Sequence, residues 1–280
     1  IHGFEIQRAE VMLLLSLLTQ ADSRERAGIP GMPADRVDVI LPGALVMAEV
    51  MKLTGAGSVV INARGIREGI VIDSVDRSPA AADEGIDRIA GVRAFGDRCA
   101  YDESHATHVA GLATSLFDQL ATALSIDVGT RPLLEAAALL HDVGYCIAYD
   151  RHHRHTYHLV VHASLPGFTN REVRRIASIA RYHTKALPKS GHEAWASLDE
   201  ADRRVVEPLA AILRLADGLD RGRAGHVWRV EASPGAGELR LVVVGEGELH
   251  PELYGVEKKK DLFERVFGLC VAVEVRPSSE

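Results

Sequence analysis

The stretch AALLHDVGY, from Ala137 to Tyr145, places a histidine and an aspartate at the end of an apolar helical segment. The apolar pattern over about 131–143 is typical of a helix that is buried in a protein core. Burying an ionised carboxylate without a partner costs several kcal/mol or more. Any fold of this chain must therefore supply partners for His141 and Asp142.

Inward-facing histidine and aspartate side chains recur on two other predicted helices. His105 lies on the apolar stripe of a helix predicted over 102–123. Asp217 continues the apolar face of a helix predicted over 200–221, and Asp220 follows three residues later. A divalent metal shared with the His-Asp pair is the simplest common explanation. Two imidazoles and two carboxylates suit Mn, Fe, Mg or Zn, and the spacing does not distinguish among these ions.

The histidines are clustered in the middle of the chain. Ten of the 13 histidines lie between His105 and His192. A single histidine on an apolar stripe is more often a hydrogen-bonded core residue than a metal ligand, so each position has this plainer interpretation. His108 shares a face with His105 and is the competing first ligand. We prefer His105 because its apolar stripe continues through Val109 and Leu112.

Composition excludes several classes of protein. The net charge of −7 argues against a general role on nucleic acid or membrane surfaces, and no apolar run is long enough to span a bilayer. Cys99, Cys146 and Cys270 match no zinc spacing, and we expect them to be reduced core residues of a cytoplasmic protein. The chain starts at Ile1 without a methionine, and we expect it to be part of a longer protein.

Periodicity predicts a mainly α fold in three parts, over 1–80, 81–222 and 223–280. In the first part we expect helices over about 8–22 and 35–54, the second kinked at Pro42-Gly43, and a buried strand over 58–62. The segment 73–85 is the expected boundary. Six helices should follow, over 86–97, 102–123, 131–143, 152–163, 170–184 and 200–221, with a Thr169/Glu172 capping box on the fifth. The last part should hold the strands VWRVEA, ELRLVVVG and LCVAVEV and an amphipathic helix, EKKKDLFERVFG, that Gly268 ends.

Longer motifs resemble known families. The order H…HD…D, with LLHDVGY and LRLADGLDR, resembles the HD superfamily of metal-dependent phosphohydrolases, which is all-helical. The stretches HHRHTYHLVVHASLPGFTNREVRRIASIARYHTK and LAAILRLADGLDR resemble the C-terminal domain of the exopolyphosphatase and guanosine pentaphosphatase family. Upstream, IPGMPADRVDVILPGALVMAEVM and ARGIREGIV resemble the end of the second lobe of that family's actin-like α/β core. A small α+β subdomain would follow the HD-type domain.

The resemblance implies a set of site residues. It implies the metal ligands His105, His141, Asp142 and Asp217, and it places His155 and His183 near the metal. Asp142 could then steer the attacking water, and His155 and His183 could protonate a leaving oxygen or bind a second ion. Cations at helix ends could neutralise substrate phosphates; these are Arg181, Lys185 and Arg221.

The resemblance also separates two sites of chemistry. It implies that the polyphosphate-cleaving machinery, a catalytic glutamate and Gly-rich loops, precedes the point where this chain begins. We therefore expect the HD-type site to hydrolyse phosphoanhydrides or phosphate esters, such as polyphosphate, guanosine pentaphosphate or a nucleotide. The alternative is a regulatory module that binds polyphosphate or an alarmone without turnover. A third interpretation makes the helical and C-terminal parts a platform for a homodimer.

Overall fold

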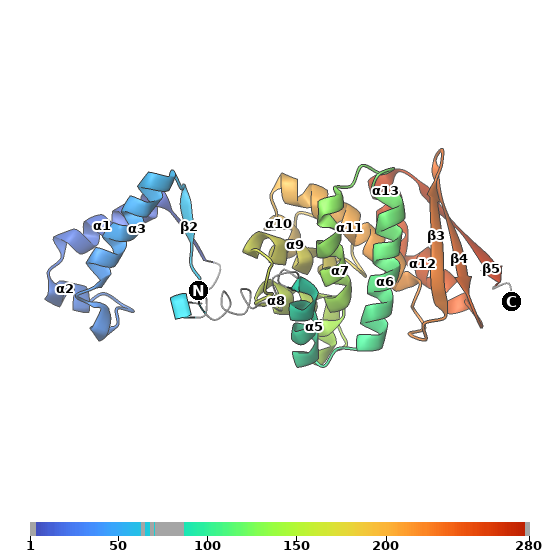
Figure 1. Cartoon of the computed structure of the whole chain (residues 1–280), viewed down its shortest axis with the longest axis horizontal. Helices are drawn as coiled ribbons and strands as arrows, with labels where there is room; N and C mark the ends of the chain where they lie inside the picture. Colours follow the sequence, from blue (N-terminus) through green and yellow to red (C-terminus); the bar gives the residue numbers. More distant parts are fainter. Residues whose placement is uncertain (1–3, 63–64, 68–69, 71–86, 278–280) are drawn as a thin grey trace. The chain divides into compact units, whose positions relative to one another are not determined.

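The computed structural model describes residues 4–62, 65–67, 70 and 87–277, which belong to two compact units, Ile1–Gly85 and Ile86–Glu280 (Figure 1). The described part is mainly helical, as the sequence predicts. Within these residues, no helix combines the length and the apolar character that crossing a membrane requires. The predicted boundary over 73–85 lies outside the described residues.

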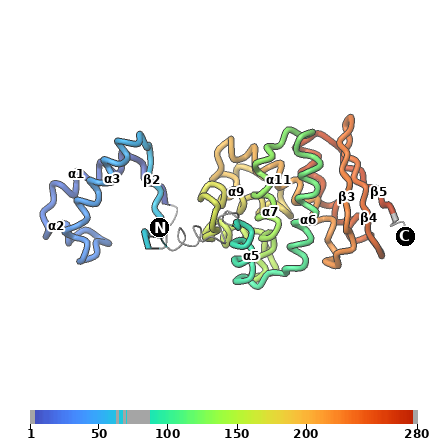
Figure 2. Tube along the Cα trace, viewed as in Figure 1, coloured from blue at the N-terminus to red at the C-terminus, as the bar shows by residue number. Residues whose placement is uncertain are grey.

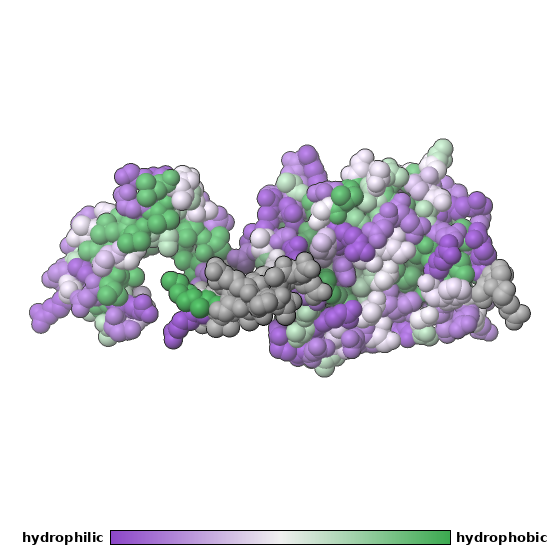
Figure 3. Space-filling model, viewed as in Figure 1, coloured by the Kyte–Doolittle hydropathy of each residue, from purple (hydrophilic) through white to green (hydrophobic). Residues whose placement is uncertain are grey.

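The first unit is a small α/β element. A short antiparallel pair, β1 (Glu5–Gln7) with β2 (Ser58–Val60), leads into two packed helices. These are α1 (Arg8–Gln20) and α3 (Ile40–Thr54), joined through the short α2 (Ser23–Ala27). Their shared core holds Val11, Ala48 and Met51. Much of the remaining apolar surface of α1 and α3 is exposed, as Figure 3 shows.

Two details of this unit differ from the prediction. The second helix starts at Ile40 rather than at 35, so Pro42 falls in its first turn. A proline there removes an N–H group that has no partner within the helix, and the predicted kink is therefore wrong. The predicted strand over 58–62 is confirmed at Ser58–Val60, but its side chains are half-buried to exposed rather than buried, because the sheet has only two strands.

The second unit begins with a helical bundle (Figures 1 and 2). Its central helix is α7, which contacts α5, α6, α9 and α11, and seven of its ten residues are buried. The predicted capping box of Thr169 and Glu172 begins α9. All six predicted helices are confirmed within a few residues. The bundle helices are α5 (Arg88–Arg98), α6 (Glu103–Leu120), α7 (Arg131–Leu140), α8 (His152–Val161), α9 (Asn170–Arg181), the one-turn α10 (Glu193–Ala196) and α11 (Glu200–Gly218).

A three-stranded sheet and two helices complete this unit. The strands β3 (Val227–Pro234) and β4 (Glu238–Gly245) are antiparallel, and β5 (Cys270–Pro277) pairs parallel to β4. The parallel pair needs a crossover, which α12 (His250–Lys259) and α13 (Asp261–Phe267) provide. The three predicted strands are confirmed, and Gly268 ends α13 with a φ of 66°. The single predicted helix is wrong, because the chain forms two helices with Lys260 at their junction.

The sheet and the bundle share one hydrophobic core. Buried side chains run without a break from α5 to β5. The Gln119 side chain joins the parts further, because its amide donates to the Val230 carbonyl at 3.0 Å and accepts from the Ala232 N–H at 2.7 Å. The C-terminal helices and the bundle are therefore held together firmly enough for both to contribute to one site.

Candidate metal centre

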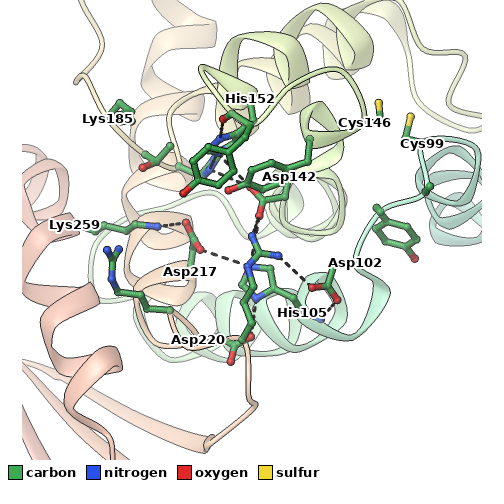
Figure 4. Close-up of a pocket in the computed structure, with 18 residues that line it drawn as sticks. Cys99, Asp102, His105, Asp142, Cys146, His152, Lys185, Asp217, Asp220 and Lys259 are labelled. Atoms are coloured by element: carbon green, nitrogen blue, oxygen red, sulfur yellow. Dashed lines mark hydrogen bonds and ion pairs between the residues drawn. The ribbon is translucent and has the colours of Figure 1, made fainter.

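A pocket of about 750 Å³ opens in the second unit, within the size range of small-molecule sites (Figure 4). Its polar side chains come from helices of the bundle, the turns that follow them and α12. They include His105 from α6, Asp142 from the turn after α7, His152 from α8, His183 after α9, and Asp217 and Asp220 from the end of α11 and just beyond it.

Two imidazoles face each other at the back of this pocket. His105 Nδ1 donates to the Asp220 carboxylate at 2.7 Å, and His141 Nδ1 donates to the Ala138 carbonyl at 2.6 Å. Both bonds fix the ring orientation and leave Nε2 as the free ligand atom, an arrangement common around bound metals. The two Nε2 atoms lie 3.2 Å apart.

Two carboxylates complete this first group. Asp142 Oδ2 lies 3.8 Å from His105 Nε2 and 3.6 Å from His141 Nε2. Asp217 Oδ1 lies 3.8 Å from each of the same nitrogens. All four side chains are at least nine-tenths buried. The residues that the sequence predicts as metal ligands therefore converge on one point.

A second group uses the other oxygen of Asp142. His183 Nδ1 donates to the Ala180 carbonyl at 2.7 Å, and His152 Nδ1 donates to the Tyr149 carbonyl at 3.2 Å. Their Nε2 atoms lie 3.2 Å apart, and Asp142 Oδ1 lies 3.5 Å from His152 Nε2 and 3.4 Å from His183 Nε2. Asp142 thus lies between two pairs of imidazoles, with one oxygen directed to each pair.

The protonation states suit cation ligands. Burial lowers the pKa of His152, and it lowers the pKa of His183 well below its ordinary value, so both rings are neutral at pH 7. Two Nε2 lone pairs then face each other, which favours a cation between them. Burial raises the pKa of Asp142, but nearby positive groups, which include the Arg223 guanidinium, outweigh this effect and hold it below its ordinary value. Both oxygens of Asp142 are therefore ionised acceptors.

Close packing brings α8 to the His-Asp turn. The N–H of Gly144 donates to the Thr156 hydroxyl at 3.0 Å, and this hydroxyl donates to the His141 carbonyl at 2.9 Å. A Cβ on Gly144 would lie 2.1 Å from the carbonyl oxygen of His152. Gly144 lies after the end of α7, where its lack of a side chain lets His152 approach Asp142.

Two cations from beyond the bundle also reach the carboxylates. The Lys259 ammonium pairs with Asp217, and the Arg223 guanidinium pairs with Asp142. Burial raises the pKa of Asp217, but Lys259 and nearby imidazoles hold it well below its ordinary value. Lys259 reaches the site because α12 packs closely on α11, where a Cβ on Gly255 would lie 2.2 Å from the α11 backbone.

The structure departs from the prediction at several positions. Lys185 and Arg221 line the pocket, as expected of phosphate contacts, but His155 and Arg181 do not. Because α8 begins at His152, its first turn faces Asp142 and His155 lies one turn further along. Arg181 lies in a separate cavity. His108, the competing ligand, is half-buried and does not line the pocket.

Sequence reasoning also missed four residues of the site. His152 lies in the same histidine-rich run as His155, so the sequence pattern that indicated His155 could also have indicated His152. Asp220 was noted, but its contact with His105 was not. No local sequence pattern identifies Arg223 or Lys259 as a site residue, because Arg223 lies in the turn after α11 and Lys259 comes from α12.

The cysteines are free thiols, as predicted, but they are not core residues. Cys99 is half-buried, and Cys146 and Cys270 are exposed. Cys99 and Cys146 line the rim of the pocket, where the turns after α5 and α7 meet.

Comparison with known proteins places this arrangement in a family. A model described as Ppx/GppA phosphatase, domain III, matches residues 88–241, and one described as Ppx/GppA phosphatase family matches residues 1–78. The chain belongs to the Ppx/GppA phosphatase family. The predicted resemblance to exopolyphosphatases and guanosine pentaphosphatases is therefore confirmed.

Two curated relatives in this family are named guanosine-5′-triphosphate,3′-diphosphate pyrophosphatase. The protein from Aeromonas hydrophila is 27% identical over 180 residues, which cover 62% of this chain and 35% of the relative. The protein from Pseudoalteromonas translucida is 25% identical over 189 residues, which cover 67% and 36%. The chain thus spans about a third of the length of these relatives. In this Ppx/GppA phosphatase chain, both groups of candidate ligands lie inside the domain III match, and Lys259 lies beyond it.

Proposed function

We propose that the second unit is an HD-type, metal-dependent phosphohydrolase whose centre would hold divalent ions at two neighbouring groups of ligands, with Asp142 belonging to both groups. The observation that carries the proposal is the position of this one carboxylate between two facing imidazole pairs. His105, His141 and Asp217 would complete one ion's ligands, and His152 and His183 the other's. Nitrogen and carboxylate donors suit Mn, Fe or Zn better than they suit Mg, which prefers oxygen ligands.

The donor set fits such ions without rearrangement of the backbone. Four Nδ1 atoms already donate to fixed acceptors, so the four Nε2 atoms are pre-oriented. Divalent ions bound there supply Lewis acidity and lower the pKa of water from about 15.7 toward 7. Both carboxylates are held ionised by their surroundings, so they keep their acceptor character down to acidic pH.

The remaining side chains of the pocket would bind and orient a phosphoryl group. Lys185, Arg221, Arg223 and Lys259 bring positive charge to the pocket from three places in the chain. Arg223 and Lys259 pair with the ligand carboxylates in the present structure, and ions at those carboxylates would free both cations for phosphate oxygens. Burial raises the pKa of Tyr145 to about 12, so its hydroxyl stays protonated and can donate to an oxyanion.

The substrate class follows from this charge. A pocket of about 750 Å³ with cations on several sides suits a polyanion with a phosphoanhydride or phosphate ester. Polyphosphate, guanosine pentaphosphate and nucleotides share that chemistry. The names of the two relatives support a guanosine polyphosphate among these candidates.

Metal content and turnover test the proposal together. Elemental mass spectrometry after incubation with Mn²⁺ should find about two equivalents in the parent, fewer than one in Asp142→Asn and about one in His183→Gln. His155→Gln is the matched control, because that histidine lies outside the pocket, and it should keep two. Phosphate release from tripolyphosphate and guanosine pentaphosphate should fall at least 100-fold in Asp142→Asn.

Three results would contradict the proposal in different ways. A parent without metal, or an Asp142→Asn variant that keeps two equivalents, would show that the imidazole pairs are not ligands. Full metal occupancy without turnover of any of these substrates would favour the regulatory binding module instead. Loss of metal from His155→Gln would place the second ion elsewhere.

A further inference from the structure

A second, smaller cavity of about 200 Å³ lies outside the metal centre. It is bounded by α8, the end of α9 and the turn that begins α10, and it shares no lining residue with the larger pocket. Four of its lining side chains are basic or imidazole groups: Arg154, His158, Arg181 and His192.

The guanidinium of Arg181 lines this cavity without a paired carboxylate among the residues that the structure describes. Its side chain is 5% exposed, and its Nη1 atom is buried without a hydrogen-bond partner. The side chain forms no hydrogen bond or ion pair with any residue that the structure describes. Its guanidinium carbon lies 5.3 Å from the ring centre of Tyr182, which provides a weak cation–π contact. An arginine stays charged at this burial, so an unpaired guanidinium here is costly.

Arg214 is a second buried arginine of this unit, and its hydrogen bonds can be compared with those of Arg181. Its side chain is 2% exposed, and it donates to the Lys259, Tyr182 and Lys185 carbonyls. It also pairs with the Asp261 carboxylate at 2.7 Å. Arg214 is therefore fully satisfied within the chain, and Arg181 is not. The difference points to a partner for Arg181 from outside the chain.

The surroundings of Arg181 favour an oxyanion as that partner. Arg154 and His158 extend from exposed positions on α8, and His192 lies on the opposite wall with Nδ1 3.3 Å from the Tyr182 hydroxyl. The carboxylate among the lining residues belongs to Glu193, which is exposed and forms no ion pair with the described residues. Two guanidinium groups thus approach the cavity, from α8 and from α9, and two imidazoles line it beside them.

We propose that this cavity is a second anion site that binds a phosphate group, with Arg181 as the buried anchor and Arg154 at its mouth. The fork of N–H donors on a guanidinium matches phosphate oxygens, and several cations around one cavity favour a doubly charged oxyanion over a single carboxylate. Free phosphate and the terminal phosphoryl group of a longer ligand share this chemistry. The proposal does not depend on the metal centre.

Isothermal titration calorimetry of the full chain tests it, with inorganic phosphate as the probe. EDTA keeps the protein metal-free, and chloride at equal ionic strength serves as the blank. We expect one phosphate per chain, with affinity reduced at least tenfold in Arg181→Met and several-fold in Arg154→Met. Arg204→Met is the matched control, since it removes an exposed arginine that lines neither cavity, and it should bind phosphate as the parent does. A titration with tripolyphosphate then distinguishes free phosphate from the terminal phosphoryl group of a longer ligand. A site for terminal phosphoryl groups also binds tripolyphosphate, whereas a closed site for free phosphate does not.

Thermal unfolding provides an independent readout. Removing an unpaired buried charge should leave the Tm of Arg181→Met at or above the parent value in phosphate-free buffer, and phosphate should no longer raise it. Arg154 is exposed, so Arg154→Met keeps the test valid if Arg181→Met does not fold. No phosphate binding by the parent would overturn the proposal. So would phosphate binding equal to the parent's in both Arg181→Met and Arg154→Met, or phosphate binding that is lost in Arg204→Met.

Discussion

At the scale of single residues, the orientation of each imidazole decides what the centre can bind. Each of the four facing histidines donates from Nδ1, three to backbone carbonyls and His105 to the Asp220 carboxylate. A backbone acceptor cannot be removed by substitution, but a carboxylate can. Asp220 is therefore the position at which the orientation of a ligand can be tested without touching the ligand.

Asp220→Asn should weaken metal binding. The amide keeps the size of the side chain but removes the charge that holds the His105 proton on Nδ1, and loss of such a partner typically costs about 10- to 100-fold in affinity. Competition against a chelator of known affinity measures the change. Asp118→Asn, an exposed carboxylate on the same helix as His105, should bind as the parent does. Equal affinities in all three proteins would contradict the role of Asp220.

The buried imidazole of His153 should make the fold acid-sensitive. Burial, with nearby Arg181, lowers its pKa to about 3 from 6.5. Between pH 6.5 and 3 the unfolded chain therefore binds a proton at this site that the folded chain does not bind, so stability falls as the pH falls through this window. Urea unfolding at pH 7.5 and 5 should show a smaller loss in His153→Gln than in the parent. His158→Gln, an exposed change on the same helix, should keep the parent's loss, and identical losses in all three would exclude His153.

At the scale of elements, two glycines control how helices approach the site. Gly144 lets α8 pack against the His-Asp turn, and Gly255 lets α12 pack against α11. In both places the backbones are too close for a methyl group. The first contact positions His152, and the second positions Lys259.

Gly144→Ala should therefore destabilise the protein and reduce metal binding. Its Cβ would meet the His152 carbonyl and the backbone nitrogen of Thr156 at 2.1 and 2.5 Å, so α8 must move. We expect a loss of at least about 2 kcal/mol in the free energy of unfolding, measured by urea denaturation. Gly111→Ala is the control, because that helical glycine has open space around it. It should gain about 0.5–1 kcal/mol. Similar effects of both substitutions would refute the close-approach argument.

At the scale of the whole molecule, the candidate centre belongs to one unit. The candidate ligands, Arg223, Lys259 and the large hydrophobic core all lie within Ile86–Glu280. The C-terminal sheet is part of that core, and α12, one of its crossover helices, places Lys259 beside Asp217. The candidate metal centre and the C-terminal segment should therefore fold and act together.

The segment 87–280 should consequently fold alone and bind the same metal equivalents as the full chain. Elemental analysis and a chelator titration of both proteins check this, because neither core residues nor ligands are removed. A segment that ends at residue 222 is the informative comparison. It exposes the apolar face that the sheet covers and lacks Lys259, so we expect it to unfold at a lower temperature. Lower occupancy in 87–280 than in the full chain would show that the first unit contributes to the centre.

Periodicity predicted the helices of the second unit well, because each is amphipathic and buries a stripe that is set by local spacing. The same stripes identified His105, His141, Asp142 and Asp217 as inward-facing, and the structure brings these four together. The kink at Pro42 and the single C-terminal helix were wrong, because both depended on where a helix starts, and spacing locates a helix start poorly.

The sequence by itself determined the family, the order of the helices and the residues on their inner faces, since these depend on residue types at short spacing. Only the tertiary structure decided that His152 rather than His155 faces Asp142, because the contact at Gly144 sets how α8 meets the turn. It likewise decided that Lys259 reaches Asp217 from a helix 42 positions away in the chain, and that Arg181 lies in its own cavity. These outcomes depend on how closely helices that are distant in the sequence pack together, and the local spacing of residue types does not specify this.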